Sequence, residues 1–360
     1  MTATNDASAQ PGGNLIKAAL VTGASGFLGS RLVATLCRSG VKVRALVRAT
    51  SDLHRLHGLD AEIVHGDVCL PESLHAAAAG QQVVFHVAAK VPDWGSRREF
   101  FRVNADGTSE VVAACQAAGV ERLVHISSLT VLGLPRQGAA VDEQSPYDPS
   151  PRDAYTASKI EAERTVRKAN GQRGLSTVAI RPGAIWGPGD PSIAPRMAAL
   201  LRQGRAVYIG RASNSLALSH IDNLTAGLLL AAVLPAAAGQ VYHLTDGEAV
   251  TARRLIDALA ATLGTKTPRF SVPFPAMYLA ASLLEGMARL AGRRTPPPFT
   301  RYGVRLVSSD CLYNNDKAER ELGYRASVSL REGLASLTQE LNGKVVSRAA
   351  NLHDGGNPNA

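Results

Sequence analysis

The sequence has few cysteines, few aromatic residues and no long apolar run. Its four cysteines stand far apart among 360 residues, at Cys37, Cys69, Cys115 and Cys311. Because they are too few and too scattered for a disulfide framework or a zinc knuckle, we expect reduced thiols and a cytoplasmic location. No stretch reaches the roughly 20 apolar residues that a membrane-spanning helix requires. With 45% hydrophobic and 19% charged residues, the chain has the composition of a globular protein.

The positive charge of the chain is not concentrated anywhere. The net charge is +9, but the basic residues form no run of five or six and are not interleaved with aromatic residues. This distribution is typical of a solvated basic surface and argues against nucleic-acid binding. The nine histidines show no metal-ligand spacing, so we expect no metal site.

Short β-rich runs alternate with longer alanine-rich stretches over the first half of the chain. We predict strands at Ala18–Thr22, Val41–Val47, Glu62–His65, Val83–Val87, Leu123–Ser127 and Thr177–Arg181. We predict helices at Leu28–Ser39, Ser73–Ala79, Val103–Ala118 and Ala157–Asn170. Strands separated by helices are typical of βαβ units with right-handed crossovers. The pattern therefore predicts an α/β fold, a Rossmann-type doubly wound parallel sheet.

This alternation loosens after residue 182, where prolines at 182, 188, 191 and 195 interrupt it. We expect a Rossmann domain at 17–182 and a smaller C-terminal substrate lobe at 183–342, partly interleaved with the sheet. The polar segments 1–16 and 343–360 are expected to be a disordered leader and tail.

Two apolar segments in the second half need an explanation. Leu224–Leu234 ends at a proline and is predicted to be a core helix. Ala276–Leu284 is followed by Arg289, Arg293 and Arg294, a pattern that suits either a lid over an apolar pocket or a helix at a membrane surface. We favour the lid and leave a peripheral membrane contact open.

Three glycines follow the first predicted strand at the start of the first predicted helix. Gly23 permits the tight turn, Gly26 lets the backbone approach a pyrophosphate, and Gly29 lets the helix pack close to the strand. The diphosphate of a dinucleotide would then meet the N–H groups at the positive end of the helix. The intervening residues of the expected NAD(P) site are Ser25, Phe27 and Leu28.

The end of the second strand bears on the choice between NAD(H) and NADP(H). An acid at this point would hold the ribose 2′-hydroxyl of NAD, but none occurs before Asp52. Arg48, helped by Thr50 or Ser51, would instead neutralise a 2′-phosphate. We therefore predict NADP(H) as the preferred cofactor, with NAD(H) as the alternative. Arg44 has a plainer interpretation, because strand alternation points it at solvent.

Two further strand ends fit the same cofactor. Asp67 and Val68 follow the third strand, where a short acid could meet the adenine amino group. Ala88, Ala89 and Lys90 close the fourth strand with small residues, as expected for backbone that passes near a ribose.

A tyrosine and a lysine stand four residues apart on one predicted helical face, at Tyr155 and Lys159. A neighbouring ammonium favours the phenolate, so we expect Lys159 to lower the pKa of Tyr155 toward neutrality. Lys159 could also hold the nicotinamide ribose. The fifth strand ends in Ser127 and Ser128, and one of these hydroxyls could bind a substrate carbonyl beside the tyrosine. Trp94, on the loop after the fourth strand, is expected to line the substrate pocket.

These motifs, with the segment Arg181–Pro188, resemble the extended short-chain dehydrogenase/reductase superfamily over about residues 17 to 335. His86–Lys90, Trp186–Asp190 and Lys317–Tyr324 are similar to the 3β-hydroxysteroid dehydrogenase branch. That branch also holds bacterial 2-alkyl-3-oxoalkanoate reductases and hopanoid-associated relatives.

The resemblance implies roles for individual residues. Counted back from Gly133, the catalytic serine falls on Ser128, with Ser127 as the fallback. Pro182 and Ile185 would contact the cofactor, and Asn104 would lie near the substrate. A homodimer through a helix bundle is a further implication of the family.

We therefore expect an NAD(P)(H)-dependent oxidoreductase that interconverts a secondary alcohol and a ketone. The resemblance implies a large apolar substrate, either sterol-like or a 2-alkyl-3-oxo acid. One alternative is a nucleotide-sugar epimerase or dehydratase with tightly bound NAD, although Leu132 stands where such enzymes usually carry a tyrosine. Another is a non-catalytic NADP-binding sensor, which would be expected to have lost the tyrosine or the lysine.

Overall fold

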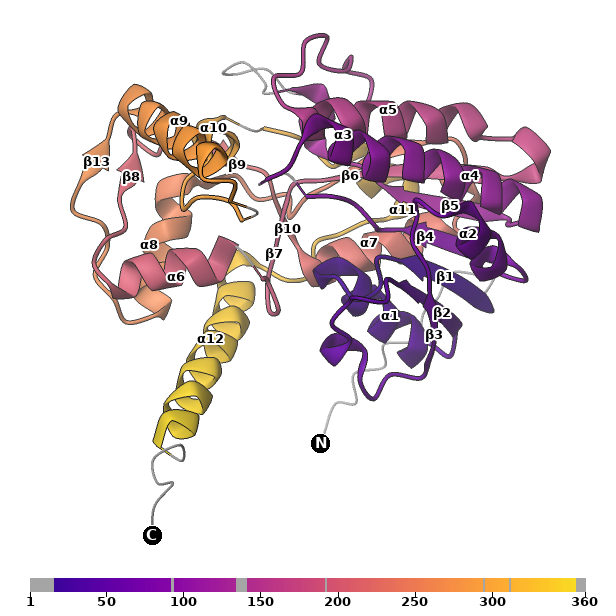
Figure 1. The fold of residues 1–360 in the computed structure, drawn as a ribbon, viewed down its shortest axis with the longest axis horizontal. Coiled ribbons are helices and arrows are strands. Elements are labelled where there is room, and N and C mark those ends of the chain that lie inside the picture. The colour runs from indigo at the N-terminus through magenta and orange to yellow at the C-terminus, as the bar shows by residue number, and fades with distance from the viewer. Residues whose placement is uncertain are drawn as a thin grey trace.

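The predicted strands assemble into one parallel sheet. The structure, a computed structural model, describes residues 16–91, 94–133, 141–191, 193–293, 295–310 and 312–353. Seven strands lie in the order β11-β6-β5-β4-β1-β2-β3 (Figure 1). They are β1 (Ala18–Thr22), β2 (Lys42–Val47), β3 (Ala61–His65), β4 (Val83–His86), β5 (Arg122–Ile126), β6 (Ser176–Pro182) and β11 (Val241–Leu244). The predicted Rossmann-type fold is confirmed.

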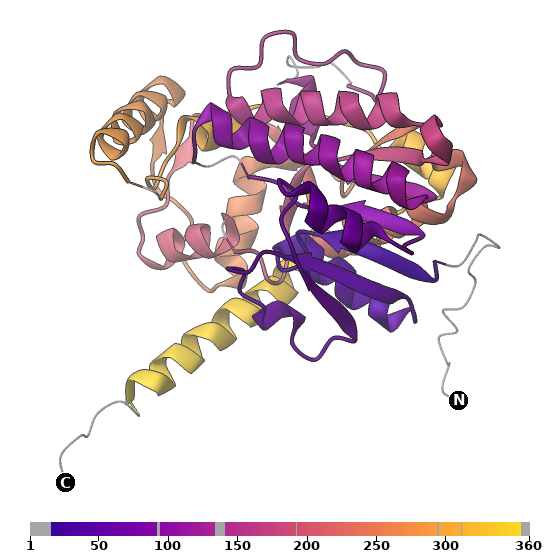
Figure 2. The same cartoon turned by 45° about the vertical axis from the view of Figure 1, so that its right-hand side comes forward.

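Helices cover both faces of the sheet (Figure 2). One face carries α1 (Phe27–Arg38), α7 (Ile221–Val233) and α11 (Asp316–Leu322). The other carries α2 (Pro71–Ala78), α4 (Gly107–Ala118) and α5 (Ala154–Ala169). The segment Leu224–Leu234 therefore forms most of a core helix, as its apolar sequence predicts.

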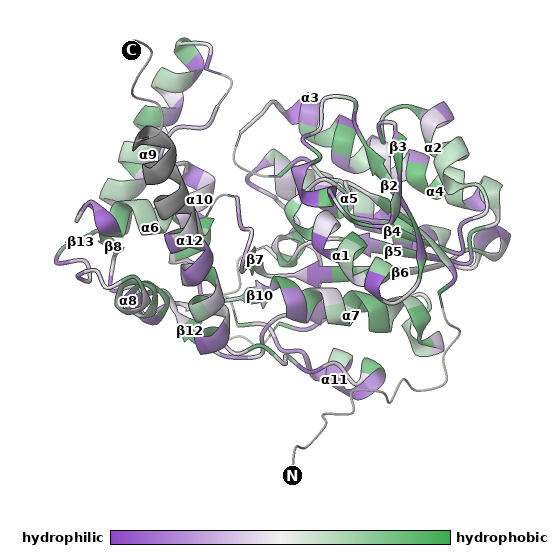
Figure 3. Cartoon of the chain, turned by 90° about the horizontal axis from the view of Figure 1, so that it is seen from below, coloured by the Kyte–Doolittle hydropathy of each residue, from purple (hydrophilic) through white to green (hydrophobic). Residues whose placement is uncertain are grey.

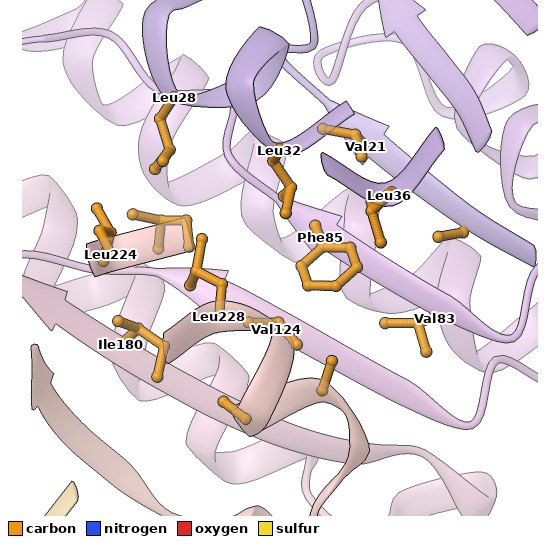
Figure 4. Packing of buried hydrophobic residues seen from close by; sticks show 14 of the residues in the cluster. Val21, Leu28, Leu32, Leu36, Val83, Phe85, Val124, Ile180, Leu224 and Leu228 are labelled. Atoms are coloured by element: carbon orange, nitrogen blue, oxygen red, sulfur yellow. The ribbon is translucent and has the colours of Figure 1, made fainter. Parts of the chain in front are cut away.

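Strand β4 shows why the sequences of the strands are continuous apolar runs. Val83 and Phe85 pack against the helices of one face, and Val84 packs against those of the other. Figure 4 shows Phe85 between Leu32 of α1 and Leu228 of α7. Because both faces are covered, each side chain is buried whichever way it points, at about 1.5–3 kcal/mol for a fully buried aliphatic or aromatic side chain.

The strand order creates a switch point between β1 and β4. From β1 the sheet grows through β2 and β3 on one side and through β4, β5, β6 and β11 on the other. The register pairs Thr22 with His86, so the chain leaves both strands at the same carboxyl edge. Such a switch point is where open α/β sheets bind their ligands.

The second half of the chain contributes to the sheet and also builds a smaller lobe. Strand β11 pairs with β6 and was not predicted, because four residues give little periodicity. The lobe lies to one side of the sheet (Figure 3) and contains α6 (Ile193–Arg202), α8 (Ala252–Thr262), α9 (Phe274–Leu290) and α10 (Arg301–Ser308). Short strand pairs also hold it, namely β7 (Ala184–Trp186) with β10 (Leu218–His220), β8 (Tyr208–Ile209) with β13 (Ser271–Val272), and β9 (Ser215–Leu216) with β12 (Val250–Thr251).

The final helix, α12 (Leu330–His353), crosses the predicted start of the tail at residue 343. Its first turns pack in the lobe core, and the rest extends away from the body of the molecule (Figures 1 and 2). The leader residues 1–15, the end of the tail at 354–360, Arg294 and Cys311 lie outside the described residues. Within the described chain, no helix combines the length and apolarity needed to cross a bilayer.

Candidate active site

The glycine turn after β1 leaves room that side chains would fill. Gly23 has φ +66°, and a Cβ there would lie 2.8 Å from the Cα of Ala88 at the end of β4. A Cβ at Gly29 would fall on the carbonyl oxygen of Gly23. Gly26 precedes α1, which has neither a side-chain cap nor an acidic residue in its first turn. These features fit the diphosphate of a dinucleotide, because the first-turn N–H groups can meet its charge.

Hydrogen bonds fix the end of β4 beside this turn. Thr22 Oγ1 lies 2.9 Å from His86 Nδ1 and accepts from the backbone N–H of Ala88 at 3.2 Å. On its other side, the His86 ring meets Thr108 of α4 at 2.9 Å. The small residues after β4 and the glycine turn after β1 are thus brought together at the switch point, as predicted. Ser25, Phe27 and Leu28 belong to the same turn and the start of α1.

Arg44 of β2 and Arg48, which follows the strand, differ in their surroundings. Arg44 is engaged, since its Nε donates to Glu62 at 2.9 Å and its Nη1 donates to the Ala77 carbonyl of α2 at 2.8 Å. Arg48 is exposed just after the strand, and no ion pair to it occurs within the described chain. Asp52 pairs with His54 at 2.8 Å. Of the two arginines, Arg48 is therefore the one that can meet a phosphate.

Arg55 also reaches this edge and was not predicted. Its Nη2 donates to the carbonyl of Gly189 at 2.8 Å, and its guanidinium carbon lies 5.9 Å from the centre of the Phe27 ring. It ties the loop after β2 to the loop after β7. Since the two bonded residues are 134 positions apart, no local pattern could have indicated this contact.

The predicted adenine contact lies on a tight turn after β3. The Asp67 carboxylate accepts from the backbone N–H of Cys69 at 2.9 Å, while its own N–H donates to Ser73 at 3.1 Å. Val68 is buried against Gly107 of α4. Both predicted residues therefore lie at the carboxyl edge, although the Asp67 carboxylate also stabilises its own turn.

The helix α5 presents Tyr155 and Lys159 toward that edge. Burial raises the pKa of Tyr155 to about 12, although part of the side chain remains exposed, and a hydrogen bond with Ser128 opposes the rise. The expectation that Lys159 brings this pKa toward neutrality is wrong for this structure. Burial outweighs the other influences, so the phenol keeps its proton at neutral pH.

Lys159 is almost fully buried, at 2% exposure. Its Nζ donates to the carbonyl of Ile126, the last residue of β5, at 2.5 Å. Burial lowers the pKa of Lys159 to about 8, and the nearby Glu163 carboxylate opposes that fall. The ammonium is therefore the prevailing form at neutral pH.

The two serines after β5 face different partners. Ser127 donates its hydroxyl to Glu163 and is held by a backbone bond to Ile180 at 2.7 Å. Ser128 forms the hydrogen bond with Tyr155 and accepts from Thr130 Oγ1 at 3.0 Å. Because the Ser127 hydroxyl is already engaged, the geometry favours Ser128 beside the tyrosine.

A buried ion pair supports the helix and the strand behind these groups. Glu163 is 0% exposed and pairs with Arg181 of β6, whose Nη2 donates at 2.6 Å. Glu163 also accepts from Tyr147 at 3.0 Å. It was not predicted, although an acid four residues after Lys159 lies on the same helical face and was a usable signal.

Asn104 lies on a π-helical segment, Phe101–Asp106, and its amide is fully engaged. Its Oδ1 accepts from the Lys90 backbone at 2.7 Å, and its Nδ2 donates to the Lys90 carbonyl at 3.1 Å and to Ser158 at 3.0 Å. These bonds hold the loop after β4 against α5. The predicted substrate contact is thus a buried clamp between two parts of the site.

Aromatic residues from two segments flank Tyr155. The ring of Phe100 lies 6.3 Å from that of Tyr155, and the ring of Tyr302 from α10 lies 6.1 Å away, both edge to face. Trp94 contacts the lobe, where its indole N–H donates to the Arg293 carbonyl at 2.9 Å. The lobe therefore covers the tyrosine. Tyr302 was not predicted, because it follows Tyr155 by more than a hundred residues.

The remaining predicted residues lie at the seam between sheet and lobe. Pro182 ends β6, and Ile185 lies in the short strand β7 that follows. Two histidines serve the packing of the fold: His125 is buried in β5, and His220 accepts from the N–H of Asp222 and caps α7.

Comparison with known proteins supports the same assignment. Residues 20–275 match the 3-beta hydroxysteroid dehydrogenase/isomerase family. A 4-hydroxy-2-methyl-3-oxo-4-farnesyl-3,4-dihydroquinoline-1-oxide ketoreductase of Stigmatella aurantiaca is 37% identical, covering 89% of this chain and 95% of the relative. A 2-alkyl-3-oxoalkanoate reductase of Stenotrophomonas maltophilia is 36% identical, covering 88% and 97%.

Among solved structures, a dTDP-glucose 4,6-dehydratase from Streptomyces venezuelae with NAD bound matches with a TM-score of 0.73. The two sequences are 26% identical, over 92% of this chain and 98% of the dehydratase. The fold, the order of the motifs along the chain and the sequence relatives all indicate the same family. The chain belongs to the 3-beta hydroxysteroid dehydrogenase/isomerase family and is an NAD(P)-dependent oxidoreductase.

Proposed function

We propose that this protein reduces the keto group of a large apolar substrate, with NADPH as the hydride donor. The observation that carries the proposal is the protonated Tyr155 phenol beside Ser128, under a roof of aromatic residues. The phenol and the Ser128 hydroxyl can both donate to a carbonyl oxygen, which is what the reduction of a ketone requires. The names of the two ketone-reducing relatives support the same direction.

Each catalytic residue has one task in this proposal. NADPH, when bound, supplies the hydride. The hydroxyls of Ser128 and Tyr155 donate to the carbonyl oxygen, and Tyr155 gives up its proton as negative charge develops there. The buried Lys159 ammonium, one helix turn away, favours the phenolate that remains but does not bring the pKa of Tyr155 to neutrality. Asn104 acts through the segments that it clamps and does not contact the substrate.

The cofactor assignment rests on residues at the carboxyl edge. Gly23, Gly26 and Gly29 would admit the diphosphate, and Arg48 would bind the 2′-phosphate of NADPH. The proposed neighbours of the adenine, ribose and nicotinamide are Asp67, Val68, Ala88, Ala89, Lys90, Pro182 and Ile185. Trp94 is proposed to line the outer part of the substrate pocket.

The substrate class follows from the apolar roof and from the relatives. Phe100 and Tyr302 offer ring surfaces beside Tyr155, which suit an alkyl chain or a fused ring system. Of the two classes considered, we favour a 2-alkyl-3-oxo acid over a 3-ketosteroid, because a reductase of such acids is 36% identical over nearly the whole chain.

The test is NADPH and NADH oxidation by the purified protein against 2-alkyl-3-oxo acids, 3-ketosteroids and UDP-4-keto sugars. We expect turnover of an apolar ketone with NADPH, and a loss of about 100-fold or more in Tyr155→Phe. Arg48→Ala should raise the KM for NADPH about tenfold or more, whereas Lys42→Ala, which removes another exposed cation of the same segment, should not. Conversion of a UDP-sugar without net cofactor consumption would overturn the proposal in favour of an epimerase.

A further inference from the structure

The helix α9 exposes a row of large apolar side chains. We call Leu279, Leu283, Met287 and Leu290 the apolar stripe; they are 61%, 60%, 58% and 91% exposed. At 3.6 residues per turn, these positions fall within an arc of about 80°. The row therefore occupies one face of the helix.

This exposure is concentrated rather than scattered. Eleven large hydrophobic residues are exposed in the described chain, and six of them lie between 270 and 290: Phe270, Phe274 and the four of the apolar stripe. The opposite face of α9 buries Met277, Ala281 and Ala288, of which the first two pack with Val304 of α10. The helix is thus apolar on both faces, and its own lobe covers only one. A contiguous exposed patch of this kind marks an interaction site.

The charges around the apolar stripe have one sign. Arg289 lies on α9 beside the apolar stripe and Arg293 follows the helix; both are exposed, and Arg289 also lies 3.5 Å from Glu285. The only acid between residues 264 and 293 is Glu285, which is 6% exposed and bonded to Arg301 of α10 at 2.9 Å. The segment 264–293 therefore offers apolar side chains and cations and has no exposed carboxylate of its own.

We propose that the apolar stripe and its flanking cations dock on an anionic lipid surface, from which the apolar substrate enters. The proposal deepens, and rests on, the proposed reduction of a large apolar ketone. Apolar side chains enter the boundary between head groups and acyl chains while the cations meet lipid phosphates. A second copy of this chain is a poorer partner, because a symmetric pairing of the two stripes would bring the same cations together.

The docked helix is also part of the roof over the active site. Glu285 joins α9 to the start of α10, and Tyr302 of α10 lies against Tyr155. On the other side, the Arg289 guanidinium lies 5.5 Å from the centre of the Trp94 ring. The membrane-facing helix is therefore one layer from the catalytic tyrosine, so an apolar ketone would have a short path out of the bilayer.

The test is flotation of the full chain with vesicles of phosphatidylcholine alone and with vesicles of phosphatidylcholine and phosphatidylglycerol in equal amounts. We expect binding to the anionic vesicles that weakens as salt is raised. The variant Leu279→Ser/Leu283→Ser/Met287→Ser should lose about tenfold or more of this affinity, and Arg289→Gln/Arg293→Gln should lose the dependence on anionic lipid. Ile63→Ser/Leu70→Ser is the matched control, because it removes exposed apolar residues far from α9.

Measurements of ketone turnover test this proposal independently of the proposed function. The triple variant should reduce a short water-soluble ketone at the rate of the parent, but show a raised KM for a long-chain ketone supplied in vesicles. Vesicle binding without ketone reduction would leave the surface assigned and the proposed function wrong. Ketone reduction with no vesicle binding, or loss of a homodimer in the triple variant measured by light scattering without lipid, would overturn the lipid surface.

Discussion

The sheet half and the smaller lobe differ in how fully they bury their apolar residues. In the sheet half, helices close both faces, and a strand such as β4 has every residue buried. In the lobe, α9 packs one face inward and leaves the apolar stripe outside. The sheet half is a closed scaffold that holds fixed catalytic groups. The lobe supplies surfaces that are completed only by something else, namely substrate on its inner side and, as we propose, lipid on its outer side.

The largest expected effect tests whether chemistry belongs to the sheet half alone. Tyr155→Phe removes the proton donor and should lower kcat about 100- to 10,000-fold. Tyr302→Phe removes a hydroxyl from the lobe while keeping the ring beside Tyr155. It should change kcat by no more than a few-fold, and its main effect should fall on KM. Steady-state kinetics on both variants is the measurement. An equal loss of kcat in both would mean that the lobe, like the sheet half, takes part in the chemistry.

The next effect is on stability and concerns the ion pair behind the site. Glu163→Gln leaves the buried Arg181 guanidinium without its counter-charge, which should cost about 3–5 kcal/mol of unfolding free energy. Glu161→Gln, on the exposed side of the same helix, should cost less than about 0.5 kcal/mol. Urea unfolding of both variants decides this.

A second variant keeps this test independent of folding yield. Glu163→Gln/Arg181→Gln removes both charges and should recover part of the lost stability. If instead the single and double variants are equally unstable, the pair does not compensate its own burial and Glu163 acts by packing alone.

The contrast between the halves also marks what the sequence could and could not predict. The strand β1 was predicted to the residue, and the glycine turn after it was found from spacing alone, because both depend on neighbours in the chain. The two-residue strands β8 and β13 pair across about sixty residues and carry no period that a sequence could display.

The site shows the same limit. Tyr155 and Lys159 share one helix turn, so their spacing reveals them, and Glu163 extends the pattern by one more turn. Arg55 and Tyr302 reach the site from partners more than a hundred residues away, and only the folded chain brings them there. The direction of the Tyr155 pKa shift was wrong because burial, which decides it, depends on segments that the motif does not contain.

A smaller effect should appear in the pH dependence of reduction. Since the pKa of Lys159 is lowered to about 8, the ammonium is lost as the pH rises above that value. The reductive kcat should therefore fall about tenfold per pH unit above pH 8. Lys159→Arg keeps its charge in this range, so its smaller kcat should show no such fall. A flat profile for the parent protein would mean that the ammonium is not needed, and the role of Lys159 would then be limited to binding.

The last effect distinguishes the two halves by their acid sensitivity. Burial lowers the pKa of His86 and His243 to about 3 and that of His125 well below its ordinary value. All three lie in strands of the sheet, whereas the lobe outside β11 has one histidine, His220 of β10, whose pKa burial also lowers. Below pH 6.5 the unfolded chain binds protons that the folded sheet excludes. The free energy of unfolding should therefore fall with decreasing pH, by about 1.4 kcal/mol per unit for each histidine.

His125 isolates one of these contributions, because neither of its ring nitrogens has a hydrogen-bond partner in the described structure. His125→Leu removes the titrating ring without breaking a bond, so the variant should lose about 1.4 kcal/mol less stability per pH unit between pH 6 and 4. Urea titrations at fixed pH values measure the slopes directly. Equal slopes in the parent and His125→Leu proteins would mean that acid opens the molecule elsewhere, and the lobe would become the first place to look.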